Sequence, residues 1–226
     1  MRSKAGGRSG SDVYLKAMTM NVCMVGYGMM GVWHSDSLRN TDAHLHTLVG
    51  RRAEPTREFA QRYGYQKWTT SLDEALADPA VDIVILTTPS EQHEVQAIQC
   101  LEAGKHTLIE IPIAMSLAGA QRVVAAGERS GKVYGVCHPL RYRRETLALR
   151  ERLLEGSETL RHVACRCFMK RLVNIGATGY HRSWSDNILW HHFCHFVDFS
   201  LFLCAPTPVR GVQSFMGERD ATTGIP

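Results

Sequence analysis

The densest group of side chains able to transfer protons lies in residues 190–198, which read WHHFCHFVD. His191 and His195 are four residues apart, and Asp198 follows three residues later. On a helix these spacings place both imidazoles and the carboxylate on one face. A neutral imidazole, with an ordinary pKa of ~6.5, accepts a proton from an alcohol as a hydride leaves the adjacent carbon. We therefore take His195 and His191 as the candidate catalytic residues.

Two other interpretations of this segment stay open. A pair of histidines at this spacing also suits zinc. Because no glutamate follows His191 directly and no third ligand is identifiable, we expect no metal. The histidines could also be core or capping residues.

A glycine-rich turn lies near the start of the chain, between an apolar run and an amphipathic one. In a GxGxxG turn the first glycine allows a tight bend, the second lets a pyrophosphate approach the backbone, and the third allows close helix packing. The start of the following helix adds amide donors and partial positive charge. An ordinary glycine-containing turn is the alternative. The residues of this predicted coenzyme loop are Gly26, Tyr27, Gly28, Met29, Met30 and Gly31.

The residues about 20 positions further on bear on which coenzyme is bound. An NAD site usually has an acidic residue there to hold the ribose hydroxyls, but this chain reads Val49-Gly50-Arg51-Arg52. Two guanidinium groups suit a 2′-phosphate, and no carboxylate repels it. The sequence thus favours NADP, with NAD possible and a solvated basic turn as the alternative.

A third segment predicted to reach the coenzyme follows the apolar run VDIVIL. Thr87, Thr88 and Pro89 end this run, and His93 begins the next helix. Ligands of doubly wound folds bind at the carboxyl ends of the strands, so these residues are expected to border the nicotinamide. Helix capping by Thr88, with His93 on the surface, is equally compatible with the spacing.

The elements that must position these residues alternate between short apolar runs and amphipathic stretches from Met20 onward. Runs such as VDIVIL are apolar on both faces, which is typical of parallel strands covered by helices on each side. We predict an α/β fold in which residues 20–140 form a dinucleotide-binding domain with a doubly wound parallel sheet. The expected strands are 21–26, 45–49, 81–87, 107–111 and 132–137, and the expected helices are 29–38, 56–63, 93–103, 117–130 and 140–155.

The pattern changes after Gly156. We predict strands at Leu160–Lys170 and Val209–Phe215 and a helix from about Ser185 to Leu203, as the beginning of an α+β domain over residues 141–226 that is incomplete. Residues 1–19, basic and rich in glycine and serine, are expected to be a disordered extension.

Composition excludes several classes of function. The 26 basic and 22 acidic residues leave a net charge of only +4, and the basic residues are scattered, so we expect no nucleic-acid partner. The apolar stretch 188–205 contains three histidines and an aspartate, which argues against a membrane span. Seven cysteines, an odd number lying mostly in apolar segments, favour reduced thiols and a cytoplasmic location.

Four segments together resemble the Gfo/Idh/MocA oxidoreductases: the GYGMMG loop, TTP with His93, AGKHTLIEIP at 103–112, and WHHFCHFVD. The resemblance implies an N-terminal domain that binds NAD(P) and a C-terminal domain whose open sheet contacts substrate and often forms a homo-oligomer. It also implies that Glu110 belongs to the coenzyme site, within the family's Glu-Lys-Pro motif. His195 matches the catalytic histidine, and His191 stands where many members have an aspartate.

Ile111 replaces the lysine of that motif, so the proton transfer of the sugar dehydrogenases does not carry over. The segments EIP and RSWSDNILWHH are similar to those of a branch of the family that oxidises a cyclic hemiacetal dicarboxylate to 2-pyrone-4,6-dicarboxylate in aromatic compound breakdown. An anionic small-molecule substrate would need cations at the site. The predicted substrate residues are His138, Arg141, Arg182 and Trp184, and a solvated or interdomain ion pair is the alternative for each arginine.

The sequence therefore predicts an NADP-dependent dehydrogenase of a hemiacetal. The alternatives are a dehydrogenase of another hydroxylated substrate within the same family, or an NADP-binding sensor without catalysis.

Overall fold

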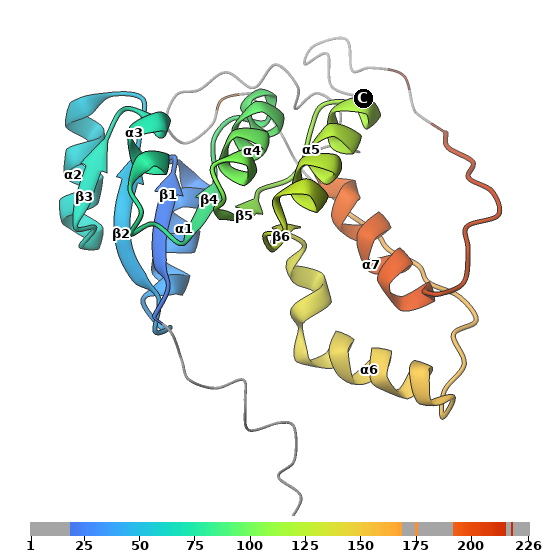
Figure 1. Cartoon of the computed structure of the whole chain (residues 1–226). Coiled ribbons are helices and arrows are strands. Elements are labelled where there is room, and N and C mark those ends of the chain that lie inside the picture. The colour runs from blue at the N-terminus through green and yellow to red at the C-terminus, as the bar shows by residue number, and fades with distance from the viewer. Residues whose placement is uncertain (1–18, 169–174, 176–191, 216–217, 219–226) are drawn as a thin grey trace, which may run out of the picture.

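The computed structural model describes residues 19–168, 175, 192–215 and 218 (Figure 1). The expected extension therefore lies almost entirely outside the described residues. Within the described ranges, no helix combines the length and apolar character needed to cross a membrane. The elements up to the last strand are β1 (Asn21–Val25), α1 (Met29–Leu38), β2 (His44–Val49), α2 (Ala53–Tyr63), β3 (Lys67–Thr69), α3 (Leu72–Ala77), β4 (Ile83–Leu86), α4 (His93–Glu102), β5 (His106–Ile109), α5 (Leu117–Ser130) and β6 (Tyr134–Val136).

The six strands form one parallel sheet in the order β3-β2-β1-β4-β5-β6. The predicted doubly wound fold is thus confirmed. The order reverses between β1 and β4, and at this point the carboxyl ends of two strands with diverging connections lie side by side. Such a switch point is where open α/β sheets bind ligands.

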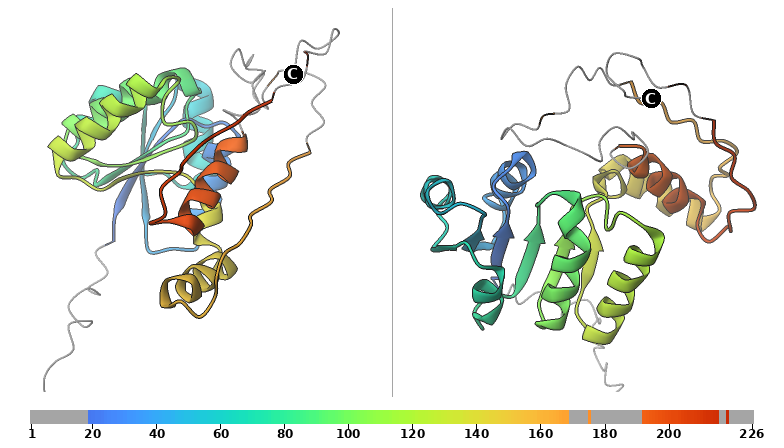
Figure 2. Two further views of the ribbon diagram at one scale, coloured as in Figure 1. Left: turned by 90° about the vertical axis from the view of Figure 1, so that its right-hand side faces the viewer. Right: turned by 90° about the horizontal axis from the view of Figure 1, so that it is seen from above.

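Helices lie on both faces of the sheet (Figure 2), and a layer of apolar side chains packs on each face, as the apolar runs predict. Successive residues of β1 point to opposite faces, so that Val22 and Met24 pack with α1 and α2, whereas Cys23 and Val25 pack with α3, α4 and α5. All four of these side chains are buried. The sheet is therefore a rigid support for the loops that follow its strands.

Local signals set most of the helix boundaries. α2 and α5 end at Gly64 and Gly131, both in the left-handed conformation. Ser116 caps α5 by accepting a hydrogen bond from the amide of Gly119. β3 and α3 were not predicted, because β3 has only three residues and lies at the edge of the sheet.

The part after β6 differs from the prediction. A short 3₁₀ helix, η2 (Pro139–Tyr142), precedes α6 (Arg144–Glu155), and α7 (Cys194–Cys204) packs against both. Residues 159–168 and 205–215 are irregular, so the strands predicted at Leu160–Lys170 and Val209–Phe215 are wrong over their described parts. A strand needs a hydrogen-bonded neighbour, and the described chain provides none there.

Candidate functional site

The glycine loop after β1 provides space that fits a pyrophosphate. Gly26 has a φ of +111°, and a Cβ there would lie 2.6 Å from Thr87 Oγ1. A Cβ on Gly31 would lie 2.5 Å from the carbonyl oxygen of Gly26. A Cβ on Gly28, by contrast, would meet nothing within 4 Å. The first and third glycines are thus required for packing, and the second leaves open space at the start of α1, where the helix amides are free to bind an anion.

The end of β2 lies beside this loop. The ring of Tyr27 covers Gly50, where a Cβ would come within 2.6 Å of the ring, and its centroid lies 6.4 Å from that of Phe59. Arg51 and Arg52 follow, and both are exposed. Neither makes an ion pair within the described part of the chain. The two guanidinium groups are therefore available to an anionic ligand.

The loop after β4 is held by hydrogen bonds to its surroundings. Thr87 Oγ1 donates to the carbonyl oxygen of Val25 at 2.9 Å, which fixes the loops of β1 and β4 together. Thr88 Oγ1 donates to Gln96 at 2.6 Å, which anchors this loop to α4. Pro89 leads into the 3₁₀ helix η1 (Ser90–Gln92).

His93 is buried and contacts two backbone carbonyl groups. Its Nδ1 lies 2.7 Å from the oxygen of Pro112, and its Nε2 lies 2.8 Å from the oxygen of Thr88. Both ring nitrogens thus face carbonyl oxygens of the chain, and a nitrogen that carries a proton donates it to the oxygen that it faces. His93 instead links the loop after β4 to the loop after β5, which carries Glu110 and Ile111.

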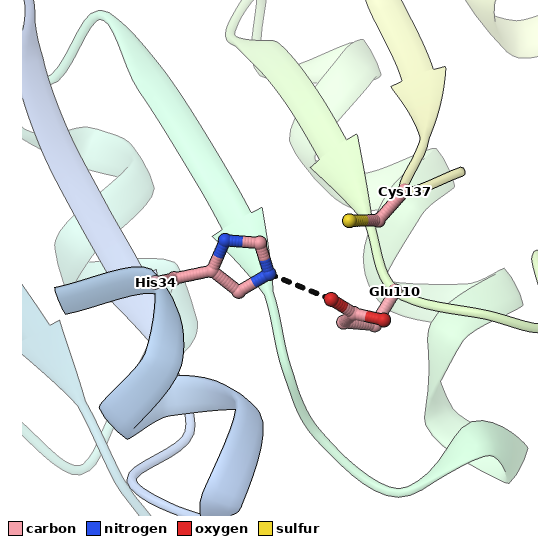
Figure 3. Close-up of side chains that lie close together, drawn as sticks. All are labelled: His34, Glu110 and Cys137. Atoms are coloured by element: carbon pink, nitrogen blue, oxygen red, sulfur yellow. Dashed lines mark hydrogen bonds and ion pairs between the residues drawn. The ribbon is translucent and has the colours of Figure 1, made fainter. Parts of the chain in front are cut away.

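Glu110 is the buried carboxylate of the site (Figure 3). His34 Nε2, on α1, lies 2.6 Å from its Oε1, and Cys137, which follows β6, lies beside it. Burial raises the pKa of Glu110, but the hydrogen bond and charge of His34 outweigh this effect, so the pKa lies below its ordinary value. Burial and the Glu110 charge raise the pKa of Cys137 to about 12, which keeps it a neutral thiol.

The ligand atoms of His34, Glu110 and Cys137 lie within 4.8 Å of one another. Imidazole, carboxylate and thiolate are all zinc ligands. In this arrangement the imidazole and the thiol both hydrogen-bond to the carboxylate, so the buried charge is stabilised by the chain itself. The chemistry available is a fixed negative charge at the carboxyl end of β5.

Two histidines meet at the carboxyl end of β6. His138 follows the strand and His195 lies in the first turn of α7, and their Nδ1 atoms are 3.2 Å apart. We call these two residues the histidine pair. The rings are perpendicular, with centroids 5.3 Å apart. Both imidazoles are half-buried, and burial is the main cause that lowers the pKa of each below its ordinary value. At neutral pH the pair is therefore uncharged and able to accept a proton.

Asp198 and Arg141 complete this cluster. Arg141 donates to both carboxylate oxygens of Asp198, and its Nε lies 2.7 Å from Oδ2. Oδ1 of the carboxylate, which accepts from Nη2 of Arg141, also lies 3.9 Å from Nε2 of His138. Arg141, predicted to bind substrate, is thus engaged in an ion pair, which is the alternative considered for each arginine, and its role toward a substrate stays a prediction.

The remaining predicted residues divide into two groups. The segment that carries His191, Arg182 and Trp184 lies outside the described residues. The coenzyme loop follows β1, Glu110 follows β5 and His138 follows β6, whereas His195 lies on α7. Because the strands are parallel, their carboxyl ends meet at one edge of the sheet.

Sequence reasoning missed His34 and Cys137. His34 lies on α1 three residues after Gly31, but its partner Glu110 is 76 residues away in the chain. Cys137 immediately precedes His138 at the end of β6, and its place next to a predicted site residue was the available signal.

Comparison with known proteins gives two matching regions. Residues 20–138 match the GFO_IDH_MocA family, described as an oxidoreductase family with an NAD-binding Rossmann fold. Residues 146–225 match the C-terminal region of bacterial oxidoreductases.

Individual proteins are also similar over large parts of the chain. The 4-carboxy-2-hydroxymuconate-6-semialdehyde dehydrogenase of Sphingobium sp. is 37% identical over 79% of this chain and 57% of that enzyme. The 1,5-anhydro-D-fructose reductase of Ensifer adhaerens is 35% identical over 60% of this chain and 40% of that protein. The solved oxidoreductase domain protein from Kribbella flavida aligns with a TM-score of 0.71 and 26% identity over 82% of this chain and 54% of that one. The chain thus spans about half the length of these relatives.

Proposed function

Because the chain belongs to the Gfo/Idh/MocA family of oxidoreductases, we propose that it is an NADP-dependent dehydrogenase that oxidises the hydroxyl group of a cyclic hemiacetal. One observation carries this proposal. The open space over Gly28 and the uncharged histidine pair lie at the same edge of the sheet. A coenzyme and a proton acceptor can therefore serve one substrate bound between them.

The coenzyme would be held by the amides at the start of α1 and by the guanidinium groups after β2. The choice of NADP is supported by Arg51 and Arg52, which are exposed and without an ion pair among the described residues. The chain has no acidic residue at this position to hold ribose hydroxyls and repel a phosphate. When bound, NADP would supply the acceptor for a hydride.

The proton would pass to His195. Ile111, at the position of the family's lysine, has an apolar side chain that cannot take or give a proton. The lowered pKa of His195, caused mainly by burial, keeps the ring a free base at neutral pH. A hemiacetal hydroxyl needs only such a base and a hydride acceptor, so the absence of the lysine is compatible with this reaction.

The substrate class is supported by the relative from Sphingobium sp., whose name describes a semialdehyde that carries a carboxylate. We propose an anionic substrate of this kind, oxidised as its cyclic hemiacetal to a pyrone dicarboxylate. Arg141 forms an ion pair with Asp198, and the proposed substrate ligands Arg141, Arg182 and Trp184 remain predictions. None of the seven cysteines, all of which lie in the described part of the chain, forms a disulfide, which supports the proposal of a cytoplasmic location. Association through a C-terminal sheet also remains a prediction.

The test has two stages. The first titrates the 226-residue chain with NADPH and with NADH and measures quenching of tryptophan fluorescence. We expect NADPH to bind at least tenfold more tightly, and equal affinity would contradict the assignment of Arg51 and Arg52. The second stage follows NADPH formation at 340 nm with the aromatic-cleavage hemiacetal, with myo-inositol and glucose as control substrates. Binding without turnover of any of the three would instead support a coenzyme-binding sensor.

A further inference from the structure

The contact within the histidine pair restricts where protons can lie. Each Nδ1 atom is either an N–H donor or a lone-pair acceptor, and at 3.2 Å one of each is required. The uncharged pair therefore has two possible arrangements. Either His195 donates to His138, or His138 donates to His195.

Asp198 distinguishes these two arrangements. Its carboxylate, largely buried at 11% side-chain exposure, lies 3.9 Å from Nε2 of His138. This distance is too long for a direct hydrogen bond, but the negative charge favours an N–H over a lone pair at the nitrogen that it faces. The bidentate contact with Arg141 holds the carboxylate in this orientation. His138 then carries its proton on Nε2, and its Nδ1 is an acceptor.

We propose that His138 is a positioning residue that fixes the tautomer of His195, so that Nε2 of His195 is the atom that takes the proton from the substrate. His195 donates its Nδ1–H to His138 and thereby has its lone pair on Nε2. That atom has no hydrogen-bond partner among the described residues. This inference deepens the proposed function and rests on it for the identity of the proton donor.

The reaction balances as follows under this assignment. The O–H bond of the hemiacetal breaks and its proton forms an N–H bond at Nε2 of His195. The electron pair of the O–H bond forms the second carbon–oxygen bond of the product lactone, and the hydride from the same carbon leaves to the nicotinamide coenzyme. The substrate is oxidised and the coenzyme is reduced. The imidazolium of His195 that results keeps its Nδ1–H directed at the lone pair of His138.

The charges around His195 support this transfer. Burial lowers the pKa of His195. Glu110, after β5, and Asp198, which lies on α7 with His195, both raise this pKa and so oppose the effect of burial. The guanidinium group of Arg141 lowers the pKa of His138, and so does the ring of His195. The positive charge formed on His195 is thus favoured by the negative charges of two carboxylates.

Two substitutions separate positioning from packing. His138→Asn keeps an oxygen acceptor near the place of Nδ1, whereas His138→Phe keeps the volume and removes the acceptor. We expect His138→Phe to lower kcat about 10- to 100-fold with KM changed less than threefold, and His138→Asn to restore most of the rate. His162→Asn, at an exposed histidine outside the site, is the matched control.

A spectroscopic measurement decides the proposal independently of turnover. Long-range ¹H–¹⁵N correlation spectra of the full chain, with His195 assigned from His195→Gln, report which nitrogen is protonated. We expect the Nδ1–H tautomer in the wild type and in His138→Asn, and a population of the Nε2–H tautomer in His138→Phe. An Nε2–H tautomer in the wild type would overturn the inference, and so would spectra of His195 unaffected by His138→Phe. Failure of the proposed function would show instead as a lack of coenzyme binding or turnover, with the tautomers unaffected.

Discussion

Substitution of Gly28 by alanine separates coenzyme binding from folding. The backbone of Gly28 has a φ of −76° and a ψ of −167°, which any residue can adopt. A Cβ there meets no atom within 4 Å. We therefore expect Gly28→Ala to change the free energy of unfolding by less than about 1 kcal/mol. The added methyl group would occupy the space in which a pyrophosphate approaches the start of α1.

The magnitude for binding follows from the contacts that would be lost. A hydrogen bond from an amide to a charged oxygen contributes ~1.5–3 kcal/mol. Loss of one such bond raises the Kd about 10- to 150-fold. Loss of more than one would raise it further, so we expect at least a tenfold weaker binding of NADPH.

Gly26→Ala is the matched control, because it should act on folding instead. Gly26 has a φ of +111°, and its Cβ would lie 2.9 Å from the carbonyl oxygen of Thr87. Strain and overlap together should cost about 2–4 kcal/mol. Calorimetric titration with NADPH and thermal melting of both variants are the assays. The reasoning is refuted if Gly28→Ala binds NADPH like the wild type, or melts as early as Gly26→Ala.

Three further outcomes are expected. Joint replacement of Arg51 and Arg52 by alanine should weaken NADPH binding about 10- to 100-fold and leave NADH binding within twofold; equal losses for both coenzymes would contradict the phosphate contact. Iodoacetamide at pH 8 should label the exposed Cys204 much faster than Cys137, whose pKa is raised to about 12. Peptide mapping of the labelled chain measures both rates, and faster labelling of Cys137 would contradict this expectation. Burial lowers the pKa of both members of the histidine pair, so the unfolded chain binds more protons just below ~6.5. Their contribution to stability is therefore present above that pH and lost as the pH falls. The urea midpoint should drop between pH 7.5 and pH 5, and drop less in His138→Asn.

The sequence predicted the alternation of strands and helices because central strands such as β1 and β4 are rich in apolar residues and helix ends are marked by residues such as Gly64 and Gly131. Short edge elements carried too little signal, and β3 was missed for this reason. The glycine loop was predictable because its positive φ at Gly26 and its close approach at Gly31 require glycine within a short stretch of chain.

The side-chain clusters could not be predicted in the same way. Arg141 was assigned to substrate because a guanidinium group suits a carboxylate, but the chain supplies its own carboxylate 57 residues later. His34 and Glu110 are 76 residues apart. Such pairs depend on how loops are placed on the folded sheet, and spacing along a single helix gives no information about them.

The ion pair between Arg141 and Asp198 also helps to hold His195, the proposed base, in place. Leu203 is the one residue of α7 that is buried, and most of the others are half-buried, so polar contacts contribute to holding this helix. Helix α7 packs against α6 and η2. Arg141 of η2 forms an ion pair with Asp198, which lies one turn after His195 on α7. The contact of His195 with His138 adds a second point of attachment on the same face of the helix. Because His138 lies two residues after the end of β6, these polar contacts link the ring of His195 to the parallel sheet. The proposed base is thereby held at the sheet edge that also carries the glycine loop, although it lies on a helix outside the sheet.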